Sequence, residues 1–244
     1  MENISEASPV ANKPSSVSSD LENGIHSALA LGLVSCGAIG TLLFTAIYLI
    51  AGATRPGYDA MAQPVSALSL GPGGWAQQAN FILYGALLIV AAVGWYRILG
   101  ARLAVIWFPL LQSVAGLCLI GAGFSSMDPW PGYPPGVTPG PTTTHGALHS
   151  LFAWILIVSL AIGCFALAPY FWRTRGWRGW AIYSGITGAL ILVFWGMFVQ
   201  GAGGPVAGLS ERLSAGSHGL WLCALTAALL LHHWRSRQQA TLPS

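Results

Sequence analysis

The chain has 244 residues, of which 54% are hydrophobic and only 7% are charged, and its formal net charge is +3. A soluble domain carries about 25% charged residues, so this composition excludes a water-soluble globular protein and favours a membrane protein. The small positive charge is explained by arginines beside apolar segments, and it gives no reason to expect nucleic-acid binding. The four cysteines lie singly in different apolar segments, so neither a disulfide framework nor a thiol redox motif is expected.

Residues 1–25 are polar and rich in Ser, Asn, Glu and Pro, and we predict that they form a disordered cytoplasmic tail. Six apolar segments follow, and each is long enough to cross the hydrocarbon core of a bilayer as a helix. They are residues 27–52, 78–99, 103–124, 147–170, 180–200 and 213–233. The sequence therefore predicts an all-α polytopic membrane protein, with a six-helix bundle within residues 26–235 and a short cytoplasmic tail at 236–244.

Arginines are concentrated in alternate gaps between these segments. The gaps after the second, fourth and sixth segments hold Arg97, Arg102, Arg173, Arg175, Arg178, Arg235 and Arg237. Short loops rich in Lys and Arg stay in the cytoplasm, so both termini are predicted to be cytoplasmic (N-in/C-in). Lys13, the single cation of the N-terminal tail, adds little to this assignment.

Small residues within the segments are expected to let the membrane helices approach closely. The glycines assigned to this role are Gly32, Gly37, Gly40, Gly185 and Gly188.

Two of the predicted extracytoplasmic loops carry strong local signals. In the first loop, Pro64 can begin a short helix and Gly71 can end it, which places Ser66 on a half-buried cap. The third loop is rich in proline and glycine and is interleaved with aromatic residues, so we predict an irregular but packed loop. Its last residues, 142–144, can cap the fourth helix and place His145 in the first helical turn.

Polar and ionisable residues gather at the predicted extracytoplasmic ends of the helices. They are Arg55, Asp59, Asn80, Asp128, His145, His149, Gln200, Glu211 and Arg212, with His218 slightly deeper. Between the tails, no acid or histidine is expected at the membrane midplane, which argues against a proton-coupled transporter. The pattern predicts a polar site, with Arg55, Asp59, Asn80, Glu211 and Arg212 as candidate ligand-binding residues.

The His145-x-x-x-His149 pair has metal-ligand spacing, since residues four apart share one face of a helix. His218 can supply a third nitrogen ligand, and Asp128 can be a fourth ligand or orient an imidazole. Three protein ligands and a water molecule form the catalytic zinc pattern. Two other interpretations remain open, namely a metal-free site for a lipid head group or other ligand, and purely structural hydrogen bonding.

Several of these residues also have ordinary structural explanations. Asp128 precedes Pro129 and suits a turn, and Arg55 and Asp59 can form an ion pair within their loop. Glu211 suits the positive end of a helix, whereas the planar fork of Arg212 suits phosphate or carboxylate.

The segment FTAIYLIAGATRPGYDAMAQPVSALSLGPGGWAQQANFILYG resembles the start of the bacterial membrane family catalogued as domain of unknown function 998. The similarity continues in GFSSMDPWPG, in HGALH and in the Glu-Arg pair before the sixth segment. The resemblance implies a six-helix protein of the bacterial plasma membrane with a shared set of outer-face motifs, and it implies no activity.

A looser similarity links the residue types to the alkaline ceramidase and progestin-and-adipoQ-receptor superfamily of membrane hydrolases. Those proteins combine Ser, Asp and three His around zinc, and the corresponding types here are Ser66, Asp128, His145, His149 and His218. Their histidine pair lies on the last helix, whereas this pair lies on the fourth. The expected function is binding of a lipid head group or small ligand; the alternative is a zinc-dependent lipid hydrolase or transferase with Asp128 and Ser66 as catalytic residues.

Overall fold

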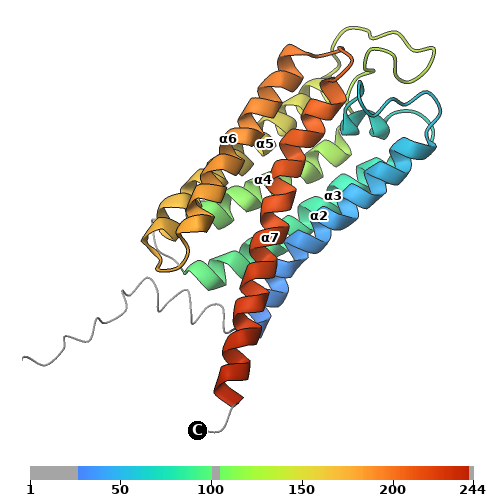
Figure 1. Cartoon of the computed structure of the whole chain (residues 1–244). Helices are drawn as coiled ribbons and strands as arrows, with labels where there is room; N and C mark the ends of the chain where they lie inside the picture. The colour runs from blue at the N-terminus through green and yellow to red at the C-terminus, as the bar shows by residue number, and fades with distance from the viewer. Residues whose placement is uncertain (1–26, 101–104, 242–244) are drawn as a thin grey trace, which may run out of the picture.

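The computed structural model describes residues 27–100 and 105–241, which form six long α-helices and one short 3-10 helix (Figure 1). In chain order these are α2 (Ala28–Thr54), η1 (Val65–Ser69), α3 (Trp75–Leu99), α4 (Trp107–Phe124), α5 (Thr144–Arg173), α6 (Arg178–Gln200) and α7 (Ala207–Thr241). The predicted tail at 1–25, with Lys13, and Arg102 lie outside the described residues.

All six long helices are long and apolar enough to cross a membrane, which confirms the predicted architecture. The helices extend beyond the apolar segments at several ends. For example, α7 begins at Ala207 rather than at 213 and continues to Thr241, so the predicted tail at 236–244 begins inside a helix. Hydropathy marks the part of a helix that fits hydrocarbon, whereas backbone hydrogen bonding continues through the polar turns on either side.

The helices pack in chain order as a closed ring. Each long helix packs against the next one along the chain, and α7 packs back against α2, although these two helices are far apart in sequence. Consecutive helices run in opposite directions, so alternate loops lie at opposite ends of the bundle. Ring closure by α2 and α7 gives the bundle an interior to which every long helix contributes.

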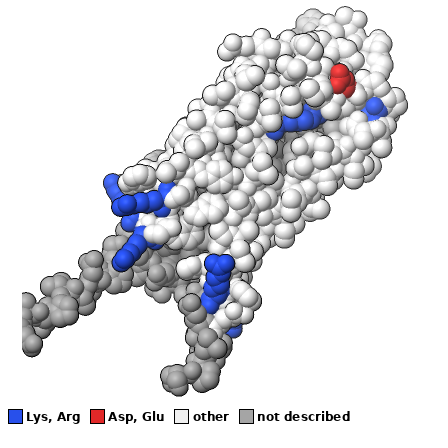
Figure 2. All heavy atoms as spheres, viewed as in Figure 1, with Lys and Arg blue, Asp and Glu red and all other residues white. Residues whose placement is uncertain are grey.

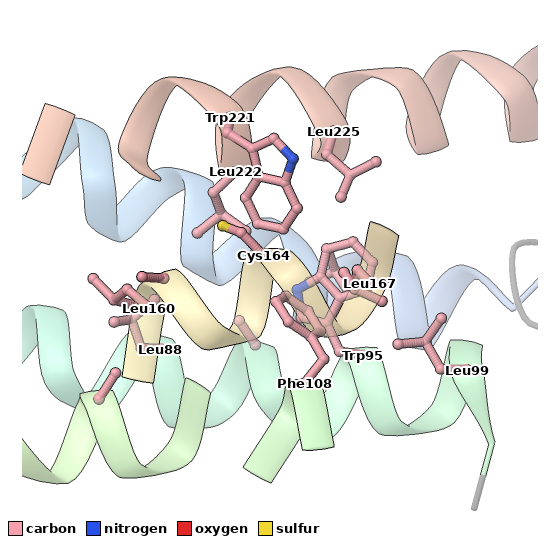
Figure 3. Close-up of a cluster of buried hydrophobic side chains, with 14 of the residues drawn as sticks. Leu88, Trp95, Leu99, Phe108, Leu160, Cys164, Leu167, Trp221, Leu222 and Leu225 are labelled. Atoms are coloured by element: carbon pink, nitrogen blue, oxygen red, sulfur yellow. The ribbon is translucent and has the colours of Figure 1, made fainter. Parts of the chain in front are cut away.

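Large aromatic side chains fill the interior of the bundle in the half that contains the end of α3 and the start of α4 (Figure 3). The Phe108 ring of α4 meets Trp95 of α3 edge-on at 5.2 Å between ring centroids, and it meets Trp221 of α7 at 5.8 Å. The indole nitrogen of Trp221 donates to the hydroxyl of Ser184 on α6 at 3.0 Å. Four helices are therefore fixed to one another around these side chains, and the aromatic packing leaves little free volume there.

Glycines permit close backbone contact at some of the helix crossings. A Cβ atom added at Gly85 of α3 would lie 2.4 Å from the carbonyl oxygen of Gly116 on α4, so neither position tolerates a side chain. Gly37 and Gly40, predicted to serve close packing, do contact side chains of α3. That interpretation is wrong for Gly32 and Gly185, because a Cβ at either position meets nothing within 4 Å. The list of packing glycines depends on helix rotation, which sequence alone does not reveal.

Arginine side chains gather at one end of the bundle, which we call the arginine end (Figure 2). It carries Arg97, Arg173, Arg175, Arg178, Arg235 and Arg237. The start of α2 and the end of α7 lie at this end too. That the arginine end faces the cytoplasm stays a prediction from the distribution of positive charge.

The opposite end, which we call the loop end, is formed by residues 55–74, 125–143 and 201–206. Pro64 precedes η1, and Gly71 follows it with a left-handed φ of +67°, as predicted. The third loop is packed, since the side chain of Trp130 stacks on Phe198 with ring centroids 5.6 Å apart. The loop end is thus an ordered cover over the ring.

Candidate functional site

A cavity of about 450 Å³ lies inside the ring, in the half nearer the loop end. Every long helix and η1 contribute to its walls. Ligand sites in proteins typically enclose about 300–1,000 Å³, so the volume suits a small molecule or part of a lipid. Most of the lining is apolar, with large side chains from Phe44, Phe81, Leu119, Leu156 and Leu160.

The cavity reaches the outer surface of the bundle between α2 and α7. Leu42, Leu49 and Leu220 line the cavity and are nevertheless 64%, 55% and 71% exposed. Small lining residues lie between them along the same seam. We call this opening the portal, and define it by Leu42, Ala46, Leu49, Ala215, Gly216 and Leu220. In a bilayer the portal faces acyl chains rather than water, because it lies within the span of both helices.

Glu211 and Ser66 form part of the cavity wall at the loop end. The carboxylate of Glu211 accepts a hydrogen bond from the backbone N–H of Val65 at 2.5 Å, and it contacts the hydroxyl and amide of Ser66. A carboxylate in this position satisfies free N–H groups at the start of η1. The hydroxyl of Ser66, a predicted catalytic group, therefore has a carboxylate as its neighbour.

Arg212 fastens the first loop to the start of α7. Its Nη1 atom donates to three backbone carbonyl oxygens at 2.7–2.9 Å, those of Ala60, Gln63 and Gly208. The other terminal nitrogen donates to the hydroxyl of Tyr58, and the guanidinium lies over the Tyr58 ring. This geometry assigns Arg212 a holding role, while its predicted contact with a ligand phosphate or carboxylate stays a prediction.

The hydroxyl of Tyr58 is held in the neutral form by its surroundings. Burial raises the pKa of Tyr58 to about 12, against the opposing effect of the nearby Arg212 guanidinium. The hydroxyl therefore keeps its proton at physiological pH, and it donates to the carbonyl oxygens of Gln63 and Pro64 at 3.2 Å and 3.0 Å. Arg212 and Tyr58 together tie the loop that precedes η1.

Three of the predicted ligand-binding residues do not line the cavity. Arg55 donates to the carbonyl of Leu70 at 3.0 Å, and Asp59 accepts from the backbone N–H of Met61 at 2.9 Å, so separate partners replace the ion pair expected between them. Asn80 is buried and its Nδ2 donates to the carbonyl of Phe44 at 3.1 Å, which links α3 to α2.

His149 lines the cavity with one ring nitrogen already bonded. Its Nδ1 contacts the carbonyl oxygens of Ser125 at 2.7 Å and Ala122 at 3.3 Å. Carbonyl oxygens only accept, so Nδ1 carries the hydrogen, and in the neutral ring Nε2 is the acceptor. His149 thus lies in the wall of the cavity with a defined ring orientation, while its predicted role as a metal ligand stays a prediction.

Two deeply buried side chains of the lining hold polar atoms that have no partner. His218 and Trp195 are 1% and 6% exposed, and within the described part of the chain neither Nε2 of His218 nor Nε1 of Trp195 has a hydrogen-bond partner. Buried polar atoms are nearly always satisfied, so each exception needs an explanation. Among the described residues, buried atoms of Gln77, Asn80, Trp95, Gln112 and Thr226 also lack a partner, but these residues do not line the cavity, and the position in its wall is what distinguishes His218 and Trp195. Trp195 was missed by sequence reasoning, because a tryptophan within an apolar helix gives no signal of its own.

The residues predicted to bind zinc are distributed over two places. Asp128 accepts from the backbone N–H of Thr143 at 3.0 Å and from its hydroxyl at 2.7 Å, beside the start of α5, where His145 is exposed. His149 and His218 line the cavity instead. Across residues 27–100 and 105–241, no three His, Cys, Asp or Glu side chains are grouped so that they can hold a metal ion. The expected three-histidine centre is therefore not assembled in this arrangement.

Thr143 shows why Asp128 lies where it does. As predicted, a threonine caps this helix: the Thr143 hydroxyl accepts from the N–H of Gly146 at 3.0 Å. Asp128 in turn orients Thr143, so these contacts fix the third loop to α5 and account for Asp128 structurally.

Comparison with known proteins gives a family but no activity. Residues 38–228 match the family described as protein of unknown function (DUF998). No curated protein and no solved structure matches the chain.

Proposed function

Because this chain belongs to the DUF998 family, whose function is unknown, we propose a function from the cavity itself: the protein binds a membrane lipid inside its helix ring. The lipid enters from the bilayer through the portal and places its tail against the apolar walls. Its polar part lies among the histidine, serine and tryptophan side chains of the lining.

The observation that carries this proposal is that strongly exposed residues also line an interior cavity. Leu42, Leu49 and Leu220 belong at once to the lipid-facing surface and to the cavity wall. An apolar cavity that served only a water-soluble ligand would be expected to open at the polar loop end. A lateral opening within the membrane span favours a ligand that already lies in the bilayer.

The zinc-dependent hydrolase or transferase is the less favoured alternative. It requires His145 to leave the surface of α5 and join the two cavity histidines, and the contacts described above give no support for that movement. Binding of a lipid uses the cavity that is already present and does not require this movement of His145.

A bulky side chain at the portal tests the proposal. A Cβ atom added at Gly216 or at Gly185 meets nothing within 4 Å, so both positions accept a larger residue without a backbone clash. Gly216 lies in the portal, whereas Gly185 lies on α6 outside the cavity lining. Gly216→Trp is expected to block the opening, and Gly185→Trp is the matched control.

The measurement is native mass spectrometry of protein extracted gently from membranes. We expect the wild type and Gly185→Trp to retain lipid at close to one molecule per chain, and Gly216→Trp to lose most of it. Retention of lipid by Gly216→Trp at the wild-type level would contradict the proposal, as would a wild type that carries none.

A further inference from the structure

We propose that the bound lipid is uncharged and that an oxygen-bearing group of it, a hydroxyl, ester or amide, is bound beside His218. This inference rests on the proposed function and specifies the class of lipid. It follows from the depth of His218, from the uncharged side chains beside it among the described residues, and from its unpartnered ring nitrogen.

His218 lies well below the charged part of the cavity wall. It follows Glu211 by two turns of α7, which corresponds to about 10 Å along the helix axis. At the next residue, a Cβ added to Gly219 would lie 2.7 Å from the methyl carbon of Thr41, so α2 and α7 are in close contact at this depth. His218 also lies eleven residues inside the apolar α7 span that begins at Ala207, so a group bound beside it is expected within the hydrocarbon region rather than at the interface.

The lining around His218 is polar in places but uncharged. Thr41 donates to the carbonyl of Gly37 at 2.9 Å, and its hydroxyl is 3.0 Å from that of Tyr84. Since the Thr41 proton is used in this way, Tyr84 donates to Thr41 and keeps its own oxygen as an acceptor. The neighbourhood thus offers hydrogen bonds without a charge.

A charged head group would be unstable at this depth. Burial of an ion without a partner costs several kcal/mol, and the two charged residues of the lining, Glu211 and Arg212, lie toward the loop end. Both are occupied by the first loop, Glu211 by the N–H of Val65 and Arg212 by backbone carbonyls.

The unpartnered atoms suit a neutral oxygen. The indole nitrogen of Trp195 can only donate, the Nε2 atom of neutral His149 accepts, and Nε2 of His218 does either according to its tautomer. A hydroxyl or amide both donates and accepts, and an ester accepts. A hydroxyl, amide or ester can therefore form a hydrogen bond with the ring nitrogens of the lining. An aliphatic chain alone would leave those of His218 and Trp195 without a partner.

The test compares two lipids that differ only in the head group. Dioleoylglycerol and dioleoylphosphatidate share their acyl chains, so their relative affinity for the purified full-length protein reports the preferred charge. We expect the wild type to bind dioleoylglycerol at least tenfold more tightly. We expect His218→Leu to bind dioleoylglycerol about 3- to 10-fold more weakly, which is the effect of losing one hydrogen bond, and His218→Gln to retain most of the binding.

Thermal unfolding of lipid-free protein provides a second readout. His218→Leu removes a buried unsatisfied atom, so its midpoint is expected to rise, whereas a purely structural histidine predicts a fall. Equal or tighter binding of phosphatidate by the wild type, or undiminished binding of dioleoylglycerol by His218→Leu, overturns this inference and leaves lipid binding intact. Failure of the wild type to bind either lipid overturns the proposed function as well.

Discussion

At the scale of single residues, the polar groups of the loop end serve two different purposes. Asp128, Arg55 and Asn80 hold backbone segments together, and each has an identified partner in a loop or a neighbouring helix. His149 and His218 instead line the cavity. Membrane proteins keep ionisable and polar groups within their spans mainly for function, so the second group is the one that indicates a ligand site.

Replacement of Asp128 separates its structural role from the predicted catalytic one. Asp128→Ala removes two hydrogen bonds to Thr143 at the start of α5, and we expect it to lower the free energy of unfolding by about 1–2 kcal/mol. Thermal unfolding in detergent measures the change. Lipid retention by native mass spectrometry should be unaffected, because Asp128 does not line the cavity.

His145→Ala is the control, since His145 is exposed in the first turn of α5, next to the Thr143 cap that Asp128 holds. Neither substitution is expected to change the metal content measured by elemental analysis. Near-stoichiometric zinc in the wild type that is lost in both variants would instead restore the zinc centre predicted from the sequence.

At the scale of elements, the sequence predicted the helices well and their rotation poorly. Long apolar runs identify membrane helices, and the cap at Thr143 and the short helix after Pro64 follow from local preferences. Which residues face the cavity depends on how the six helices rotate and close the ring. Sequence alone therefore groups His218 with His145, although His218 lines the cavity and His145 is exposed, and it gives no signal for Trp195.

The first turns of α7 and the first loop act as one unit at the loop end. The backbone N–H of Leu209 donates to the carbonyl of Met61 at 3.0 Å, and a Cβ added at Gly208 would lie 2.2 Å from the carbonyl oxygen of Gln63. Glu211 and Arg212 complete the attachment through their side chains. These contacts hold the first loop against the wall of the cavity at the loop end.

Weakening this attachment should loosen the loop without unfolding the helices. Arg212→Lys replaces a planar fork that reaches several carbonyls by a single ammonium group. We expect the amides of residues 58–66 to exchange hydrogen for deuterium at least tenfold faster, because the hydrogen bonds to Ala60 and Gln63 are lost. Arg175→Lys, an exposed arginine at the arginine end, is the control. Unchanged exchange together with lost lipid binding would make Arg212 a ligand contact rather than a clamp.

At the scale of the whole molecule, the ring divides into two halves with different packing. The half nearer the arginine end is filled by the aromatic side chains of Trp95, Phe108 and Trp221. The half near the loop end encloses the cavity and is covered by η1 and the packed loops. Closure of the ring by α2 and α7, the first and last described helices, places small residues at the seam and produces the portal.

Photo-crosslinking in native membranes tests the central claim, that a lipid occupies the cavity, most directly. A diacylglycerol with a diazirine in one acyl chain is incorporated, irradiated, and its adducts are mapped by peptide mass spectrometry. Ile157 and Leu160 of α5 line the cavity but are only 4% and 6% exposed, so bulk lipid does not reach them. We expect adducts at these two residues, and we expect Gly216→Trp to abolish them. Adducts confined to outward-facing positions of the same helix, such as Leu151 and Ile162, would contradict the account.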